Sequence, residues 1–206
     1  MFAGCGAIVA NTERGGIGPN GIAVAFGLVI MVMIYATGHV SGAHINPAVT
    51  IAFTATRHFP PRETLAYVPS QLGGAIGGAL LLRAVWHGTP ANLGATVPTV
   101  GSGAAFAYEL VLTAFLMFVI MAVATDTRAV GEAAAIAIGG AVALDALFGG
   151  PITGASMNPA RTLGPAIVAS EWTDTWIYLV APVTGALAGA ILYALIRGAP
   201  ENVESA

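Results

Sequence analysis

The chain has 206 residues, of which 56% are hydrophobic and 8% are charged, with a net charge of -3 and a mean hydropathy of +0.81. Soluble proteins average about 25% charged residues, so this composition indicates a membrane protein. The chain has no Lys and no basic patch, which argues against a nucleic-acid partner. The single Cys5 excludes an internal disulfide, and no cluster of His and Cys suggests a metal site.

Apolar runs of the length that a membrane-crossing helix needs, about 20 residues, recur along the chain. They are Gly21–Val40, Arg62–Leu82, Ala104–Thr125, Glu132–Gly149 and Thr175–Arg197. The opening Met1–Ala10 is apolar but only about half a span long, and it lacks the basic flank and cleavage site of a secretory peptide. We expect it to be a truncated first span that begins upstream, so that residues 1–206 form one six-span domain with residues 199–206 as a tail.

Nearly the same decapeptide occurs twice, as SGAHINPAVT from Ser41 and as TGASMNPART from Thr153. A second pair follows at a similar offset, QLGGAIGGALL from Gln71 and PVTGALAGAIL from Pro182, in which glycines four apart let helices approach closely. Two halves of three spans each, about residues 1–90 and 104–198, enter the membrane in opposite orientations because three is an odd number. The sequence therefore predicts inverted repeats.

Each decapeptide leads into an apolar run that is only about half a membrane thick. Asn is a favoured N-cap and Pro is favoured at the first helical position, so each Asn-Pro pair indicates a helix start. Irregular backbone at membrane depth persists only inside protein or beside a watery cavity. We expect two re-entrant half-helices whose positive N-termini meet near the membrane midplane, where the amide groups of the two Asn residues donate hydrogen bonds to water and the helix dipoles disfavour cations. The runs are Pro47–Thr56 and Pro159–Ala169.

Paired Asn-Pro-Ala boxes in a six-span inverted frame resemble the major intrinsic proteins, the aquaporins and aquaglyceroporins. The phrasing GLVIMVMIYATGHVSGAH and GGPITGASMNPARTLGPA is most similar to the nodulin-26-like branch and its bacterial relatives, although the family's first-span Glu is missing. The resemblance implies an all-α, multi-pass channel of the cell membrane, a homotetramer without a cofactor, through which water and small neutral solutes pass. The pore boxes are Asn46, Pro47, Ala48, Asn158, Pro159 and Ala160.

The resemblance also assigns a selectivity filter, made of Phe26, Ala146, Ala155 and Arg161. Arg161 stands where the first decapeptide has Val49, and an arginine inside an apolar half-helix is costly, so it is by default functional. Its alternative is a buried structural salt bridge, and the alternative for Phe26 is ordinary packing.

Small residues at two filter positions predict a wide and apolar filter. Strict water channels typically have a His at the position of Ala146 and often a Cys at that of Ala155, so this filter should admit glycerol and boric or arsenous acid. Thr162 and Ala166 qualify this expectation, because glycerol-specialised relatives usually have an Asp and a basic residue there.

Three further polar residues need an account. Glu109 lies inside an apolar run and needs a partner; the resemblance implies that it accepts hydrogen bonds from a re-entrant loop, with a proton relay as the alternative. For His44 we expect a structural role in the first loop, with a pH gate as the alternative. Asp145 has no assigned role, and polarity at the pore mouth is one option.

Arginines near the span ends indicate an orientation. Arg57, Arg62, Arg128 and Arg197 fall on one side if the spans alternate, and the positive-inside rule makes that side, with the C-terminus, cytoplasmic. Alternatives to the wide channel are a strict water channel, a secondary transporter with ionisable coupling groups at the midplane, and an adhesion protein. An enzyme is disfavoured, because the repeated motif has no nucleophile with a base and no carboxylate pair.

Overall fold

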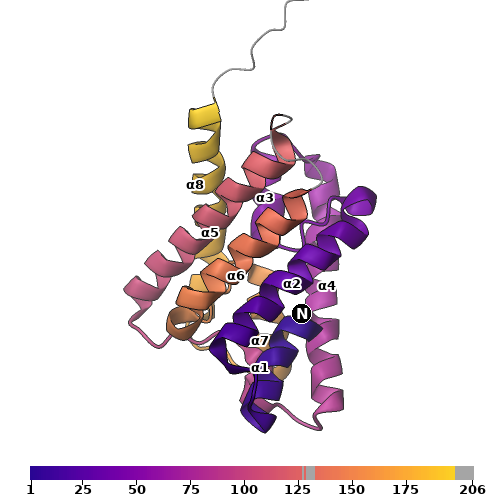
Figure 1. Ribbon diagram of the computed structural model, residues 1–206, viewed down its shortest axis with the longest axis vertical. Helices are drawn as coiled ribbons and strands as arrows, with labels where there is room; N and C mark the ends of the chain where they lie inside the picture. Colours follow the sequence, from indigo (N-terminus) through magenta and orange to yellow (C-terminus); the bar gives the residue numbers. More distant parts are fainter. Residues whose placement is uncertain (127, 129–132, 198–206) are drawn as a thin grey trace, which may run out of the picture.

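The computed structural model describes residues 1–126, 128 and 133–197, and the secondary structure of these residues is helical throughout. The helices α2, α4, α5, α6 and α8 are long and apolar enough to cross a membrane (Figure 1). A 3-10 segment, η1 (Pro90–Gly94), lies between α4 and α5. The helices are α1 (Phe2–Arg14), α2 (Gly18–Ser41), α3 (Pro47–Ala55), α4 (Pro61–Val85), α5 (Ser102–Thr125), α6 (Ala134–Thr153), α7 (Pro159–Ala169) and α8 (Thr175–Arg197).

These helices confirm the predicted all-α bundle of five full spans, a short first helix and two half-helices. The 13 residues of α1 extend for about 20 Å, less than the roughly 30 Å of a bilayer's hydrocarbon core. The 9 residues of α3 and the 11 of α7 each cover about half of that core. In Figure 1, α3 lies in the upper half of the bundle and α7 in the lower half.

The bounds of one span differ clearly from the prediction. The sequence predicted that the fourth full span ends at Gly149, but α6 continues through Pro151 to Thr153 and ends where Gly154 takes the left-handed conformation, with φ 84°. Gly149 instead packs against Leu112 of α5 inside the helix. The predicted start, Glu132, lies outside the described residues.

Glycines set the closest helix contacts. The pairs α5–α8 and α2–α6 have the most extensive interfaces. A Cβ on Gly185 or Gly189 of α8 would run into backbone carbonyls of α5, and Gly27 and Gly139 face each other across α2 and α6. The predicted close approach at the α8 glycines is therefore present. The matching pair on α4 behaves differently, because Gly78 contacts Met1 whereas Gly74 has open space beside it.

A polar cluster ties the end of α5 to α8. Asp126 accepts hydrogen bonds from Arg128 at 2.7 and 2.9 Å and from the Tyr193 hydroxyl at 2.7 Å, and the Arg197 guanidinium lies 3.6 Å away. These donors, first of all the Arg128 side chain, hold the pKa of Asp126 well below its usual range. A carboxyl whose pKa is depressed on folding stabilises the fold above its unfolded pKa of about 3.9 and loses that contribution as the pH falls below it.

Acidification should therefore weaken this tie. We expect detergent-solubilised wild type to lose thermal stability between about pH 5 and pH 2, and Asp126→Asn to be less stable at pH 6 but to change less with pH. The measurement is the midpoint of thermal aggregation at each pH. Parallel losses in both proteins would show that Asp126 does not contribute to the acid response.

Candidate functional site

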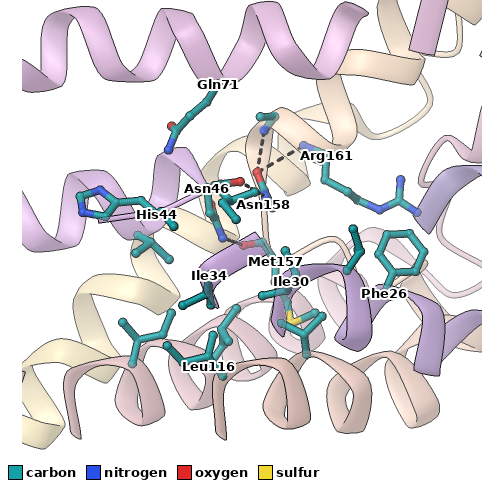
Figure 2. Close-up of a pocket in the computed structure, with 18 of the residues that line it drawn as sticks. Phe26, Ile30, Ile34, His44, Asn46, Gln71, Leu116, Met157, Asn158 and Arg161 are labelled. Atoms are coloured by element: carbon teal, nitrogen blue, oxygen red, sulfur yellow. Dashed lines mark hydrogen bonds between the residues drawn. The ribbon is translucent and has the colours of Figure 1, made fainter. Parts of the chain in front are cut away.

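Two asparagine side chains join the half-helices at their N-termini. Asn46 caps α3 by accepting from Ala48 N at 2.9 Å, and Asn158 caps α7 by accepting from Ala160 N at 3.0 Å. Each amide nitrogen then donates across to the other loop, Asn46 to Met157 O at 2.7 Å and Asn158 to Ile45 O at 2.9 Å (Figure 2). The sequence predicted the caps, and it did not predict these reciprocal bridges.

The two loops before the asparagines have the same unusual backbone. Left-handed φ values occur at matching positions, and a non-glycine residue there costs about 1–2 kcal/mol. Such strain persists only where the surroundings fix the conformation. The φ values are Gly42 79°, Ala43 45° and Ile45 54° in the first loop, and Gly154 84°, Ala155 42° and Met157 52° in the second.

Glu109 of α5 supports the second loop. Its Oε1 accepts from Ser156 N at 2.9 Å and from the Thr153 hydroxyl at 2.7 Å, and its Oε2 accepts from Met157 N at 2.7 Å. The side chain is fully buried and does not line the cavity described below. Both of its oxygens are thus occupied by the loop, which is the structural arrangement that the resemblance implied.

His44 supports the first loop in a different way. Its Nδ1 lies 3.1 Å from the Thr50 hydroxyl, and its ring packs against Phe53, Phe59 and Tyr67 with centroid distances of 4.7–4.9 Å. Thr50 donates to Asn46 O at 3.1 Å and accepts from the Gln71 amide at 3.0 Å. The ring is therefore held between a hydroxyl and an aromatic wall.

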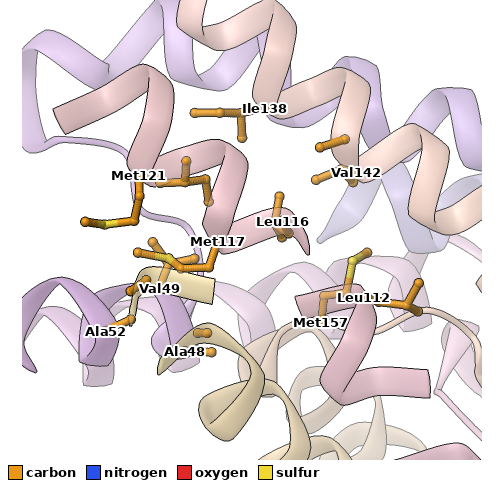
Figure 3. Packing of buried hydrophobic residues seen from close by; sticks show 14 of the residues in the cluster. Ala48, Val49, Ala52, Leu112, Leu116, Met117, Met121, Ile138, Val142 and Met157 are labelled. Atoms are coloured by element: carbon orange, nitrogen blue, oxygen red, sulfur yellow. The ribbon is translucent and has the colours of Figure 1, made fainter. Parts of the chain in front are cut away.

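Apolar side chains pack behind the first half-helix. Ala48 and Val49 are buried in one cluster with Met117 and Met121 of α5 (Figure 3). The first Asn-Pro-Ala box is thereby held by hydrophobic contacts with α5 and by the hydrogen bond from Asn46 to Met157 O.

A cavity of about 370 Å³ passes the two asparagines. Its wall is largely apolar, as Ile30, Ile34 and Leu116 in Figure 2 illustrate. All four predicted filter residues line it, together with Asn46, Asn158, Ala160 and His44, whereas Pro47, Ala48 and Pro159 are buried behind it. Sequence reasoning missed Gln71, which also lines the cavity and which was detectable as a polar residue inside a predicted span.

Arg161 lines the cavity together with the other predicted filter residues. Its Nη1 donates to Gly94 O at 2.7 Å, and its Cζ lies 5.1 Å from the centre of the Phe26 ring. Within the part of the chain that the structure describes, no carboxylate forms an ion pair with Arg161, so the salt-bridge alternative has no partner there. The carbonyl of Gly94 has no signature in the sequence and was not foreseen.

Asp145 is a second buried acid, but it lacks the hydrogen bonds that Glu109 accepts from the second loop. It is 1% exposed, and neither carboxyl oxygen has a hydrogen-bond partner among the described residues. It does not line the cavity, although its neighbour Ala146 does. This burial is inconsistent with a pore-mouth position.

A helical bundle whose two half-helices meet, N-terminus to N-terminus, beside a cavity inside the bundle is the architecture of a transmembrane channel. The comparisons agree: the model of the Major intrinsic protein family matches residues 1–193, and the chain belongs to that family. It is a multi-pass membrane channel and not an enzyme.

Two plant relatives and one solved structure illustrate the similarity. Nodulin-26 of Glycine max is 52% identical over 198 residues, which cover 96% of this chain and 73% of that protein. Aquaporin NIP1-4 of Oryza sativa subsp. japonica is 49% identical over 197 residues, covering 96% and 72%. The X-ray structure of the aquaglyceroporin from Plasmodium falciparum aligns with a TM-score of 0.83 at 27% identity, covering 96% of this chain and 90% of that one.

The two buried acids should respond oppositely to loss of charge. Glu109→Gln replaces one acceptor oxygen by an NH2 group that faces backbone donors, so we expect a loss of about 1–3 kcal/mol in unfolding free energy. Asp145→Asn removes an acid without described partners and should leave stability unchanged or raise it. Thermal denaturation of both variants in detergent checks this, and equal destabilisation would contradict it.

Proposed function

We propose that the chain conducts water and small uncharged solutes passively, among them glycerol and boric or arsenous acid. The observation that carries the proposal is that Arg161, Phe26, Asn46 and Asn158 all line the same cavity. A solute that follows this cavity meets a cationic donor beside an aromatic ring, then two amide groups, in a wall that is otherwise largely apolar.

The small side chains of the filter support the inclusion of solutes larger than water. Two of its four walls are the methyl groups of Ala146 and Ala155, and the ring of Phe26 offers a third, apolar wall. Arg161 lines the cavity and donates to Gly94 O through Nη1, whereas its Nη2 is not fully buried and has no hydrogen-bond partner among the described residues, so the filter retains a donor for a hydroxyl group. A strict water channel would have less room and more donors at these places.

Exclusion of ions follows from charge and from the helix ends. Two helix N-termini face the cavity centre and contribute about half a positive elementary charge each, and Arg161 adds a full charge at the filter. Cations are disfavoured at both points. Anions, although attracted, lose hydration in a passage with largely apolar walls.

Passive conduction is favoured over coupled transport. Among the described residues, the titratable side chains that line the cavity are His44 and Arg161. Glu109 is a buried carboxylate that could bind a coupling ion only if its oxygens were free, but both oxygens accept hydrogen bonds from the second loop. A transporter would need ionisable groups that are free to bind an ion at the midplane.

Purified protein in vesicles tests the proposal. Under an osmotic gradient, vesicles with wild type should shrink faster than empty ones, admit glycerol and boric acid, and hold a proton gradient. Ala146→His narrows the filter and should lower glycerol permeability by about tenfold or more, as steric exclusion in a fitted pocket does, while water still passes. A wild type that passes water but neither solute would restrict the function to water, and proton leakage would contradict the mechanism.

We also propose that residues 1–206 form one channel domain of two inverted repeats, about 1–90 and 104–198, that assembles as a homotetramer with its C-terminus in the cytoplasm. Four arginines support the orientation: Arg57, Arg62, Arg128 and Arg197 fall on one side, against Arg14 and Arg83 at helix ends on the other. The tail at 199–206 lies outside the described residues.

Two measurements check orientation and assembly. A tag placed after Ala206 should be digested by protease in inverted membrane vesicles and protected in intact cells. Chemical cross-linking in the membrane should produce a band of four subunits. A tag digested from outside, or a limit of two subunits, would contradict the respective proposal.

A further inference from the structure

A directed chain of hydroxyl groups lies behind the filter. The Thr162 hydroxyl is 2.8 Å from that of Thr96 and 2.6 Å from that of Ser156, and Ser156 donates to Asn158 O at 2.9 Å. A hydroxyl has one hydrogen. Because Ser156 uses its hydrogen on a carbonyl, Thr162 must donate to Ser156, and Thr96 must therefore donate to Thr162. The three hydroxyl side chains are buried, with 1–4% of their surface exposed.

This chain and Arg161 attach the same loop to α7. Thr96 reaches Thr162, and two residues earlier Gly94 O accepts from the Arg161 guanidinium at 2.7 Å. Both contacts are buried, so consecutive residues of α7 hold the loop at two neighbouring points. The guanidinium can stay beside the cavity only while Gly94 O keeps its place.

The loop needs such attachment, because its backbone is strained. Four consecutive residues have left-handed φ values, and the side chains of Ala91 and Leu93 disfavour this conformation. A further contact, from the Asn92 amide to Glu171, is exposed to solvent. The four residues are Ala91 with φ 48°, Asn92 46°, Leu93 55° and Gly94 75°.

The first half of the chain has an equivalent side-chain contact, but this contact does not lead to a filter residue. Thr50 occupies the place of Thr162 and bonds with His44, which occupies the place of Ser156. Its third partner is Gln71 of α4 and not a loop that holds an arginine. The link from this hydroxyl position to the filter is therefore particular to the second half.

We infer that Thr96 and Thr162 are positioning residues for Arg161, and that their hydroxyl bond sets how well the filter selects hydroxylated solutes against water. The inference rests on the proposed function. A polyol or boric acid needs the guanidinium in a fixed place to replace its hydration, whereas water needs only one donor at a time. Loss of the hydroxyl bond frees the strained loop, and the guanidinium with it.

The experiment compares Thr96→Val and Thr162→Val, which keep the side-chain shape but remove the hydroxyl, with Thr96→Ser and Thr162→Ser, which keep the hydroxyl. Thr184→Val is the matched control, because the Thr184 hydroxyl is exposed and bonds only to carbonyls of its own helix. Each protein is reconstituted in vesicles, and the permeabilities to boric acid and to water are measured per folded molecule.

Both Val variants should lower the ratio of boric acid to water permeability by about fivefold, the factor that corresponds to one ordinary hydrogen bond. The Ser variants and Thr184→Val should keep the wild-type ratio. The double Val variant should show no further loss, because both substitutions break the same bond. This ratio is insensitive to the amount of folded protein, so a purely structural role would not move it.

The other outcomes distinguish a failure of the inference from a failure of the proposed function. Val variants that conduct with the wild-type ratio would overturn the inference while the proposed function stands. If Thr162→Val does not fold, Thr96→Val decides alone, because it leaves the bonds from Thr162 to Ser156 and from Ser156 to Asn158 in place. Wild-type vesicles that pass neither water nor boric acid would overturn the proposed function, and the inference with it.

Discussion

Two crossed hydrogen bonds, from Asn46 to Met157 O and from Asn158 to Ile45 O, hold the centre of the molecule together. Each amide uses its oxygen to cap its own half-helix and one hydrogen to hold the carbonyl of the other loop. If either loop moves, a bridge breaks and a buried carbonyl or amide loses its partner, which costs about 1–3 kcal/mol. The cavity centre is thereby a property of both halves at once, and it does not form from either half alone.

The two halves share this geometry but not its support. Ser156 N donates to the carboxyl group of Glu109 at 2.9 Å, whereas the equivalent His44 N donates to the Tyr67 hydroxyl at 3.4 Å. Glu109 accepts three hydrogen bonds of 2.7–2.9 Å from the second loop, and short bonds of this kind are stronger than a single contact at 3.4 Å. The second loop is therefore the more firmly fixed of the two, and it is the one that continues into Arg161. Firm support coincides with the half in which we propose the selective contact.

Much of this arrangement was predictable from the sequence, because spans and half-helices depend on apolar run length and on caps that the chain itself contains. The starts of α3 and α7 at Pro47 and Pro159 follow from Asn-Pro pairs, and both were predicted to the residue. What escaped prediction involves backbone atoms. The acceptors Gly94 O and Met157 O carry no side-chain signature, and their partners are fixed by tertiary packing. The end of α6 was missed because Gly149 and Pro151 resemble a helix stop, but Gly149 packs against Leu112 and Pro151 lies within the helix.

A filter built with alanines depends on its backbone for its width. Ala155 has no side chain that can swing toward or away from the cavity, so the position of its methyl group follows from its left-handed φ of 42°. Its N–H donates to the Thr153 hydroxyl at 3.1 Å, which in turn donates to Glu109 at 2.7 Å. Glu109 therefore fixes one wall of the filter through Ala155 and, through Met157 N, the same loop whose carbonyl Asn46 holds. A displacement at the midplane bridges would change the filter as well, because a single short loop connects the two.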